Sequence, residues 1–177
     1  SNFNNLMQDW NTVYNSCLSM GYKEIEPRVI IEEFLDSNKG QLYDYKFFCF
    51  HGEPKFVYVA VDHFQGQISK ISLFDLNWKN LDVKYDKHKN INRPIPKPQC
   101  FDEMLRIAKI LSKDFPFVRV DFYEVKEKVY VGELTFTPGG GFGKYKPFSW
   151  DYKLGEWLDL NKLNPEYVHI LPEFKEK

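Results

Sequence analysis

Apolar residues recur at the helical period in three parts of the chain. Within residues 3–20 they fall three and four positions apart, which predicts an amphipathic helix that ends at Gly21. The same spacing predicts a second helix over residues 101–115, just after the proline-rich stretch 93–98, which can continue neither a strand nor a helix. A short helix is predicted over residues 154–160.

Runs that are β-branched or aromatic, bounded by turn residues, predict the strands. These runs lie at residues 29–35, 44–51, 55–63, 68–75, 117–125 and 129–136. Short turns join three of them in succession, which is typical of an antiparallel meander, whereas residues 76–98 are polar and predict a long loop. The pattern predicts an α+β fold with a mostly antiparallel sheet flanked by helices, and 177 residues suffice for one domain.

The last two predicted strands form a hairpin whose register follows from the hydrophobic pattern. A three-residue turn at 126–128 places apolar side chains on one face and opposes Phe122 to Gly132. On the other face, Arg119 lies opposite Thr135 and Asp121 lies opposite Glu133. The sequence therefore predicts a charged face on this hairpin.

Two directly opposed carboxylates repel each other, so a positive charge is expected between them. Oxygen ligands from two strands suit Mg²⁺ that is partly coordinated by substrate phosphates. Equally, Arg119 could neutralise both acids on a solvated polar face. The glycine-rich segment 138–143 follows the hairpin directly, and glycines let backbone amides approach an anion closely.

Composition narrows the classes of partner and compartment. The 24 Lys and Arg residues nearly balance 25 Asp and Glu residues, so no global field attracts nucleic acid or an anionic membrane. The three cysteines form no CxxC pair, and no apolar run is long enough to span a membrane. We expect a cytoplasmic protein without a nucleic-acid partner or a membrane span.

Four ordered segments carry a resemblance to a known family. They are Pro27-Arg28-Val29-Ile30-Ile31-Glu32-Glu33, Asp44-Tyr45-Lys46-Phe47-Phe48, Arg119-Val120-Asp121-Phe122-Tyr123 and Gly132-Glu133-Leu134-Thr135-Phe136-Thr137-Pro138-Gly139. The hairpin resembles the ATP-grasp superfamily, in which an Arg-x-Asp precedes a Glu-x-Asn-x-x-Pro-Gly; Thr135 stands where that family usually has Asn. The full set resembles the TupA-like branch, which is associated with bacterial cell-surface polysaccharide and teichuronopeptide synthesis.

The resemblance implies ATP and Mg²⁺ as cofactors and a role for each matched residue. Asp121, Glu133 and Thr135 would hold the metal, Lys46 would neutralise phosphate, and Arg119 would stabilise charge on the transferring group. The strand at residues 30–35 would bind adenine at its edge, through the backbone groups of Glu32, Glu33 and Leu35, with Asp44 on the ribose. The implied enzyme is an ATP-dependent ligase that activates a carboxylate as an acyl phosphate and joins it to an amine.

The resemblance also implies partners and a domain arrangement. The partners are a nucleotide, a glycan or glycan-precursor acceptor and an amino-compound donor. Residues 1–21 would be a helix left from the upstream half of the ATP-grasp domain, and residues 22–177 its C-terminal subdomain, a fragment that need not be active alone. Two alternatives stay open: a Mg²⁺-dependent glycosyltransferase or phosphotransferase of polysaccharide synthesis, and a non-catalytic sheet domain.

Overall fold

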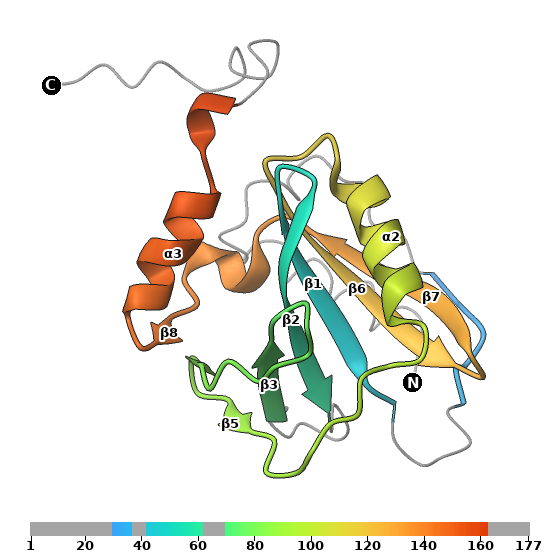
Figure 1. Cartoon of the computed structure of the whole chain (residues 1–177). Helices are drawn as coiled ribbons and strands as arrows, with labels where there is room; N and C mark the ends of the chain where they lie inside the picture. The colour runs from blue at the N-terminus through green and yellow to red at the C-terminus, as the bar shows by residue number, and fades with distance from the viewer. Residues whose placement is uncertain (1–29, 37–41, 62–69, 163–177) are drawn as a thin grey trace, which may run out of the picture.

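A six-stranded sheet with helices on its two faces forms the body of the protein (Figure 1). The structure, a computed structural model, describes residues 30–36, 42–61 and 70–162. The strand order is β5-β3-β2-β1-β6-β7, and every pairing is antiparallel except that of β3 with β5. A separate two-stranded sheet pairs β4 with β8. The predicted α+β class is confirmed.

The helices and strands follow the predicted order along the chain. Their bounds are β1 Asp44–Phe50, β2 Glu53–Val61, β3 Lys70–Phe74, β4 Lys84–Tyr85, β5 Lys89–Asn90, α2 Phe101–Ser112, β6 Phe117–Val125, β7 Lys128–Thr135, β8 Tyr145–Lys146 and α3 Ser149–Trp157. Short 3₁₀ turns occupy Pro138–Gly141 and Leu160–Lys162. The helix predicted over residues 3–20 lies outside the described residues. No helix in the described ranges is long and apolar enough to cross a membrane.

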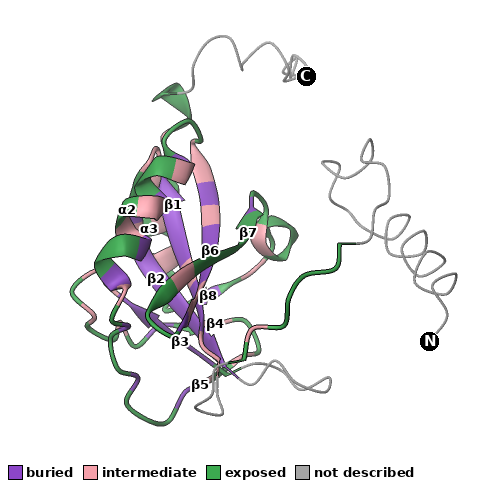
Figure 2. Ribbon diagram, turned by 90° about the vertical axis from the view of Figure 1, so that its right-hand side faces the viewer, coloured by how far each residue is buried: buried purple, intermediate pink, exposed green. Residues whose placement is uncertain are grey.

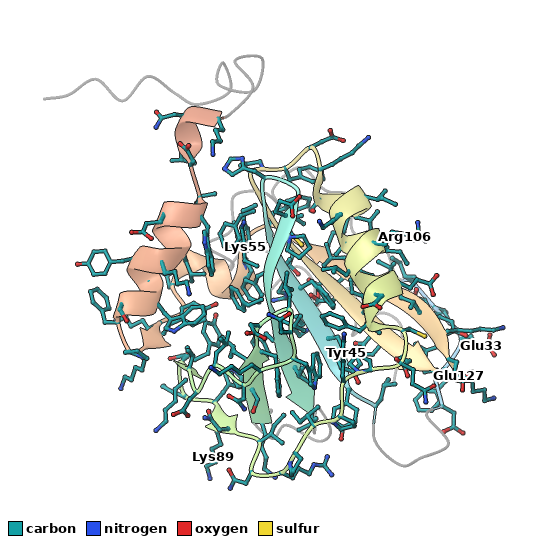
Figure 3. The ribbon with its side chains drawn as sticks, viewed as in Figure 1. Glu33, Tyr45, Lys55, Lys89, Arg106 and Glu127 are labelled. Carbon is teal, nitrogen blue, oxygen red and sulfur yellow. The ribbon has the colours of Figure 1, made fainter. Side chains whose placement is uncertain are left out.

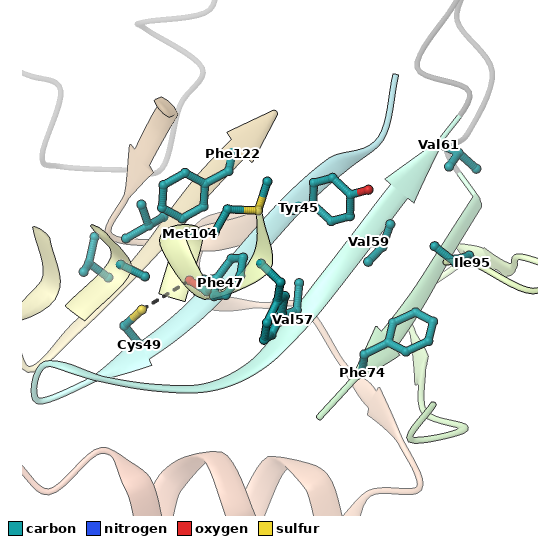
Figure 4. Packing of buried hydrophobic residues seen from close by; sticks show 14 of the residues in the cluster. Tyr45, Phe47, Cys49, Val57, Val59, Val61, Phe74, Ile95, Met104 and Phe122 are labelled. Atoms are coloured by element: carbon teal, nitrogen blue, oxygen red, sulfur yellow. Dashed lines mark hydrogen bonds between the residues drawn. The ribbon is translucent and has the colours of Figure 1, made fainter. Parts of the chain in front are cut away.

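One face of the sheet packs against α2. Phe47 of β1 and Val57 of β2 are fully buried beneath Met104 of the helix (Figure 4), and Val120 of β6 belongs to the same buried cluster. The predicted apolar stripe of the helix supplies this contact, while Arg106 lies on its solvent side (Figure 3). The main core therefore lies between α2 and the central strands β2, β1 and β6.

The opposite face of the sheet has an apolar half, which α3 and the small sheet cover. Phe48 of β1 stacks on Phe56 of β2 with ring centroids 4.5 Å apart. Phe56 in turn meets Trp150 of α3 edge to face at 5.7 Å. In Figure 2 the buried residues follow the central strands, whereas β7 at the sheet edge is largely exposed.

Three local predictions about these elements are wrong. The short helix starts earlier than expected, at Ser149, and ends at Trp157. The loop 76–98 contains β4 and β5 and buries Val83 and Ile91, because its scattered apolar residues pack under the sheet. The strand predicted over residues 29–35 does not form in the described part, 30–36, which has no ladder partner and exposes Ile31 to 92%.

The β6–β7 hairpin reaches the predicted charged register by a different route. The turn has two residues, Lys126 and Glu127, so Val125 pairs with Lys128 and not with Val129. A β-bulge then leaves Gly132 unpaired, and Phe122 faces Val131 instead of Gly132. Past the bulge the predicted pairs return, with Asp121 opposite Glu133 and Arg119 opposite Thr135. The bulge thus compensates for the shorter turn.

The turn itself is open to a stability test. Lys126 and Glu127 have φ of 53° and 59°, a left-handed conformation that costs residues other than glycine and asparagine free energy. Two-residue hairpins of this kind favour Asn-Gly. We expect the double variant Lys126→Asn/Glu127→Gly to raise the free energy of unfolding by about 1 kcal/mol, measured by urea denaturation. Valine at both positions should lower it, and the opposite ranking would contradict the turn geometry.

Candidate functional site

A row of polar side chains crosses four strands on the sheet face opposite α2. Tyr58 of β2 pairs with Lys46 of β1, Lys46 pairs with Asp121 of β6, and Asp121 pairs with Glu133 of β7. Partners across antiparallel strands project to the same face, so the row is a direct product of the sheet register. The predicted residues Lys46, Asp121 and Glu133 are therefore brought together.

Asp121 is the centre of this cluster. Its side chain is 2% exposed, and its Oδ2 accepts hydrogen bonds from Lys46 Nζ at 2.5 Å and from Arg119 Nη2 at 2.6 Å. Arg119 Nε donates to Oδ1 at 2.7 Å, so the guanidinium holds the carboxylate through two nitrogens. A carboxylate this deeply buried is tolerated because two cations flank it.

The other predicted residues, Asp44, Glu133 and Thr135, contact Lys46, Arg119 or each other. Lys46 Nζ also lies 2.6 Å from Asp44 Oδ2, within the same strand. On the β7 side, Arg119 Nη2 reaches Glu133 Oε2 at 3.4 Å, and Thr135 Oγ1 donates to Glu133 Oε1 at 2.7 Å. The five charged groups carry three negative and two positive formal charges, so the cluster is electrostatically close to balance.

The environment shifts the pKa of Arg119 and of the neighbouring Tyr123. Burial alone lowers the pKa of the Arg119 guanidinium, but the hydrogen bond and charge of Asp121 and the charges of Glu133 and Asp44 outweigh it and raise the pKa. Burial also raises the pKa of Tyr123 to about 12, with a further contribution from the three nearby carboxylates. Both groups thus keep their protonated forms at neutral pH.

The donor atoms fit a hard divalent cation that retains other ligands. Asp121, Glu133 and the Thr135 hydroxyl supply oxygens from two adjacent strands, the ligand type that Mg²⁺ prefers. Across the described ranges, no group of three or more His, Cys, Asp or Glu side chains is arranged to hold a metal. Mg²⁺ is usually bound by one or two carboxylates together with substrate phosphates, so two carboxylates are as many acidic ligands as the protein needs to supply.

The predicted adenine contacts do not join the cluster. Glu32 and Glu33 are exposed, with Glu33 at the periphery of the molecule (Figure 3), and Leu35 is half-buried. Among the described residues, none of the three forms a hydrogen bond or ion pair with the cluster. Asp44, predicted on the ribose, is 4% exposed and paired with Lys46. The structure thus gathers six of the nine predicted site residues, namely Asp44, Lys46, Arg119, Asp121, Glu133 and Thr135.

Sequence reasoning missed two tyrosines and one glycine at this face. Tyr58 is 7% exposed and pairs directly with Lys46, which the register of the β1–β2 hairpin could have revealed. A Cβ on Gly132 would lie 2.8 Å from the ring of Tyr123, so the bulge needs glycine for that ring to pack. The bulge, which sets the position of Glu133, carries no signal in the hydrophobic alternation.

The two opposed carboxylates allow a comparison of burial. Asp121 is 2% exposed and Glu133 56% exposed. Asp121→Ala removes the carboxylate that pairs with Lys46 and Arg119 and leaves both cations without it. We therefore expect the free energy of unfolding to fall by about 2 kcal/mol or more. Glu133→Ala should cost less than about 1 kcal/mol, as for an exposed pair. Equal losses in urea denaturation would contradict Asp121 as the electrostatic centre.

Comparison with known proteins agrees with these motifs. The family model described as TupA-like ATPgrasp matches residues 1–159, which is most of the chain. No curated protein and no solved structure matches the chain. The match spans α2, the charged row and the glycine-rich segment, so the chain belongs to the TupA-like ATP-grasp family.

Proposed function

We propose that this chain contributes the metal and phosphate contacts of an ATP-dependent carboxylate–amine ligase. The supporting observation is the convergence of two cations and two opposed carboxylates on one sheet face. In the proposed reaction a carboxylate oxygen attacks the γ-phosphorus of ATP, forming an acyl phosphate and ADP. The amine then attacks the acyl carbon, and phosphate and a proton leave.

The chief obstacle to this chemistry is the approach of an anion to a polyphosphate. Lys46 lies across from Asp121 on β1 and Arg119 lies two residues before it on β6; both bind its carboxylate, and they are the side chains suited to hold phosphate oxygens. Arg119 uses Nε and Nη2 for the carboxylates, and Nη1 has no hydrogen-bond partner among the described residues. That nitrogen is a donor suited to the transferring phosphoryl group.

Asp121, Glu133 and Thr135 are the residues that we propose for the metal. When bound, Mg²⁺ supplies positive charge to the phosphate oxygens and thereby lowers the repulsion. Asp121 accepts three hydrogen bonds, whereas an ionised carboxylate offers about four lone-pair directions. Metal binding at Asp121 therefore needs at most a partial release of Lys46 or Arg119.

The remaining roles are proposed on the family resemblance. We place adenine at Glu32, Glu33 and Leu35, ribose at Asp44, and the C-terminal ATP-grasp subdomain at residues 22–177, with residues 1–21 belonging to the upstream half. The described residues 30–36 have no ladder partner, which supports the first of these, since a backbone edge must be unpaired to meet adenine. We place the reaction in the cytoplasm, in cell-surface polysaccharide synthesis, with a glycan-type acceptor and an amino compound.

One observation favours a second candidate, a non-catalytic sheet domain. Lys46 and Arg119 already satisfy Asp121, so the cluster is stable as a structural ion network without any ligand. The two candidates differ in one measurable respect: only the ligase site binds nucleotide more tightly when Mg²⁺ is present.

Binding of a fluorescent ATP analogue to the 177-residue chain tests this difference. We expect Mg²⁺ to tighten binding, measured by fluorescence anisotropy with and without EDTA. Glu133→Gln should weaken the Mg²⁺-dependent binding at least about tenfold, because a carboxylate ligand is lost. Asp121→Asn should do the same, with circular dichroism as the check on folding.

Glu127→Gln provides the matched control, since it removes an acid from the turn of the same hairpin, outside the charged row. Its binding should equal that of the unmodified chain. Two results would favour the structural ion network: a nucleotide affinity that does not depend on Mg²⁺, or an affinity that falls equally in Glu127→Gln and Glu133→Gln.

A further inference from the structure

A cavity of about 600 Å³ opens on the same sheet face as the charged cluster. Its floor includes Phe48 of β1 and Phe117 of β6. Leu154 and Gly155 of α3 form one wall, and the glycine-rich segment after β7 lies on another side. Its size suits a drug-sized or smaller molecule.

The cavity lies beside the proposed phosphate and metal site, although none of the six clustered residues lines it. Alternate residues of a strand share a face, so Lys46 and Phe48 lie side by side on β1, the first in the charged row and the second in the cavity floor. Phe48 is also the direct cross-strand partner of Arg119. The charge of Arg119 acts on the pKa of Tyr145, a cavity-lining residue, opposing the rise that burial causes.

The lining chemistry restricts what the cavity can bind. Most lining side chains are aromatic or aliphatic, so hydroxyl-rich ligands would lose hydrogen bonds to water without replacing them. Asp151 is the single charged residue that lines it, and within the described part of the chain its carboxylate has no ion-pair partner. Asp151 Oδ1 accepts only a long hydrogen bond of 3.4 Å, from the Tyr145 amide.

We propose that this cavity binds an amine with an apolar, ring-sized body, its ammonium group at Asp151 and its body over Phe48 and Phe117. An acid in an otherwise apolar cavity selects for positive charge, and the aromatic floor selects for an apolar ring. This inference rests on the proposed function, in which the cavity holds the amine substrate beside the phosphate site. It narrows that substrate from any amino compound to an apolar one.

Binding of small probes to the 177-residue chain, without nucleotide or metal, tests the proposal. Saturation-transfer NMR with 2-phenylethylamine, 3-phenylpropionate, 2-phenylethanol, glucosamine and adenosine separates charge from shape. We expect 2-phenylethylamine to bind most tightly, by about tenfold over the neutral alcohol, as for a hydrogen bond to a charged group. Equal or tighter binding of the acid, glucosamine or adenosine would overturn the assignment, as would no binding of the amine.

Three variants locate the bound amine. A Cβ added to Gly155 meets nothing within 4 Å, and leucine suits a helix better than glycine, so Gly155→Leu should fill the cavity without unfolding α3. It should abolish binding, and Asp151→Asn should reduce amine binding about tenfold while leaving 2-phenylethanol unchanged. Glu156→Leu, an exposed α3 residue outside the cavity lining, is the matched control and should bind like the unmodified chain.

The outcomes separate this inference from the proposed function. If amine binding is absent, or survives Gly155→Leu, the cavity assignment is wrong whatever the Mg²⁺-dependence of nucleotide binding. If amine binding behaves as expected and nucleotide binding ignores Mg²⁺, the cavity stands as an amine site and the ligase proposal is wrong.

Discussion

The buried carboxylate of Asp121 is the constraint on which this face of the sheet depends. An unpaired charge at 2% exposure would be prohibitively costly, so Lys46 of β1 and Arg119 of β6 must both lie within hydrogen-bonding distance. A shift of one residue in the β1–β6 register would turn Lys46 to the α2 face and bury its ammonium among aromatic rings. The ion cluster and the apolar core therefore select the same register from opposite faces.

The charged hairpin could be predicted because alternation alone separates its two faces. On β6, Val118 and Val120 are fully buried beneath α2. The alternating residues Arg119 and Asp121 lie on the opposite face, in the cluster. The turn could not be predicted in the same way, since two or three residues satisfy the same strand pattern once a bulge is allowed. Gly132 is the residue that absorbs the difference, because its missing Cβ makes room for the Tyr123 ring.

Other features could not be predicted from the sequence, for a different physical reason. The run at residues 30–35 has strand propensity, but a strand needs a partner, and none of the described strands pairs with it. Leu134 is the cross-strand partner of the fully buried Val120 and is nevertheless 38% exposed, because α2 packs mainly over β1, β2 and β6 and much less over the edge strand β7. The cavity arises from packing among α3, the glycine-rich segment and the sheet, which no local pattern encodes.

Charge balance couples the ligands of the proposed site. If phosphate oxygens bind Lys46 or Arg119, the buried carboxylate of Asp121 loses part of the positive charge that neutralises it. A cation bound at Asp121 and Glu133 would replace that positive charge. At the proposed site, nucleotide and metal would therefore favour each other's binding through one carboxylate, with no need for a third acidic ligand. The apolar side chains beside Arg119, such as Phe48, would strengthen this coupling because they exclude water and lower the local dielectric. The division of one sheet face into a charged half and an apolar half therefore serves the electrostatics as well as the packing.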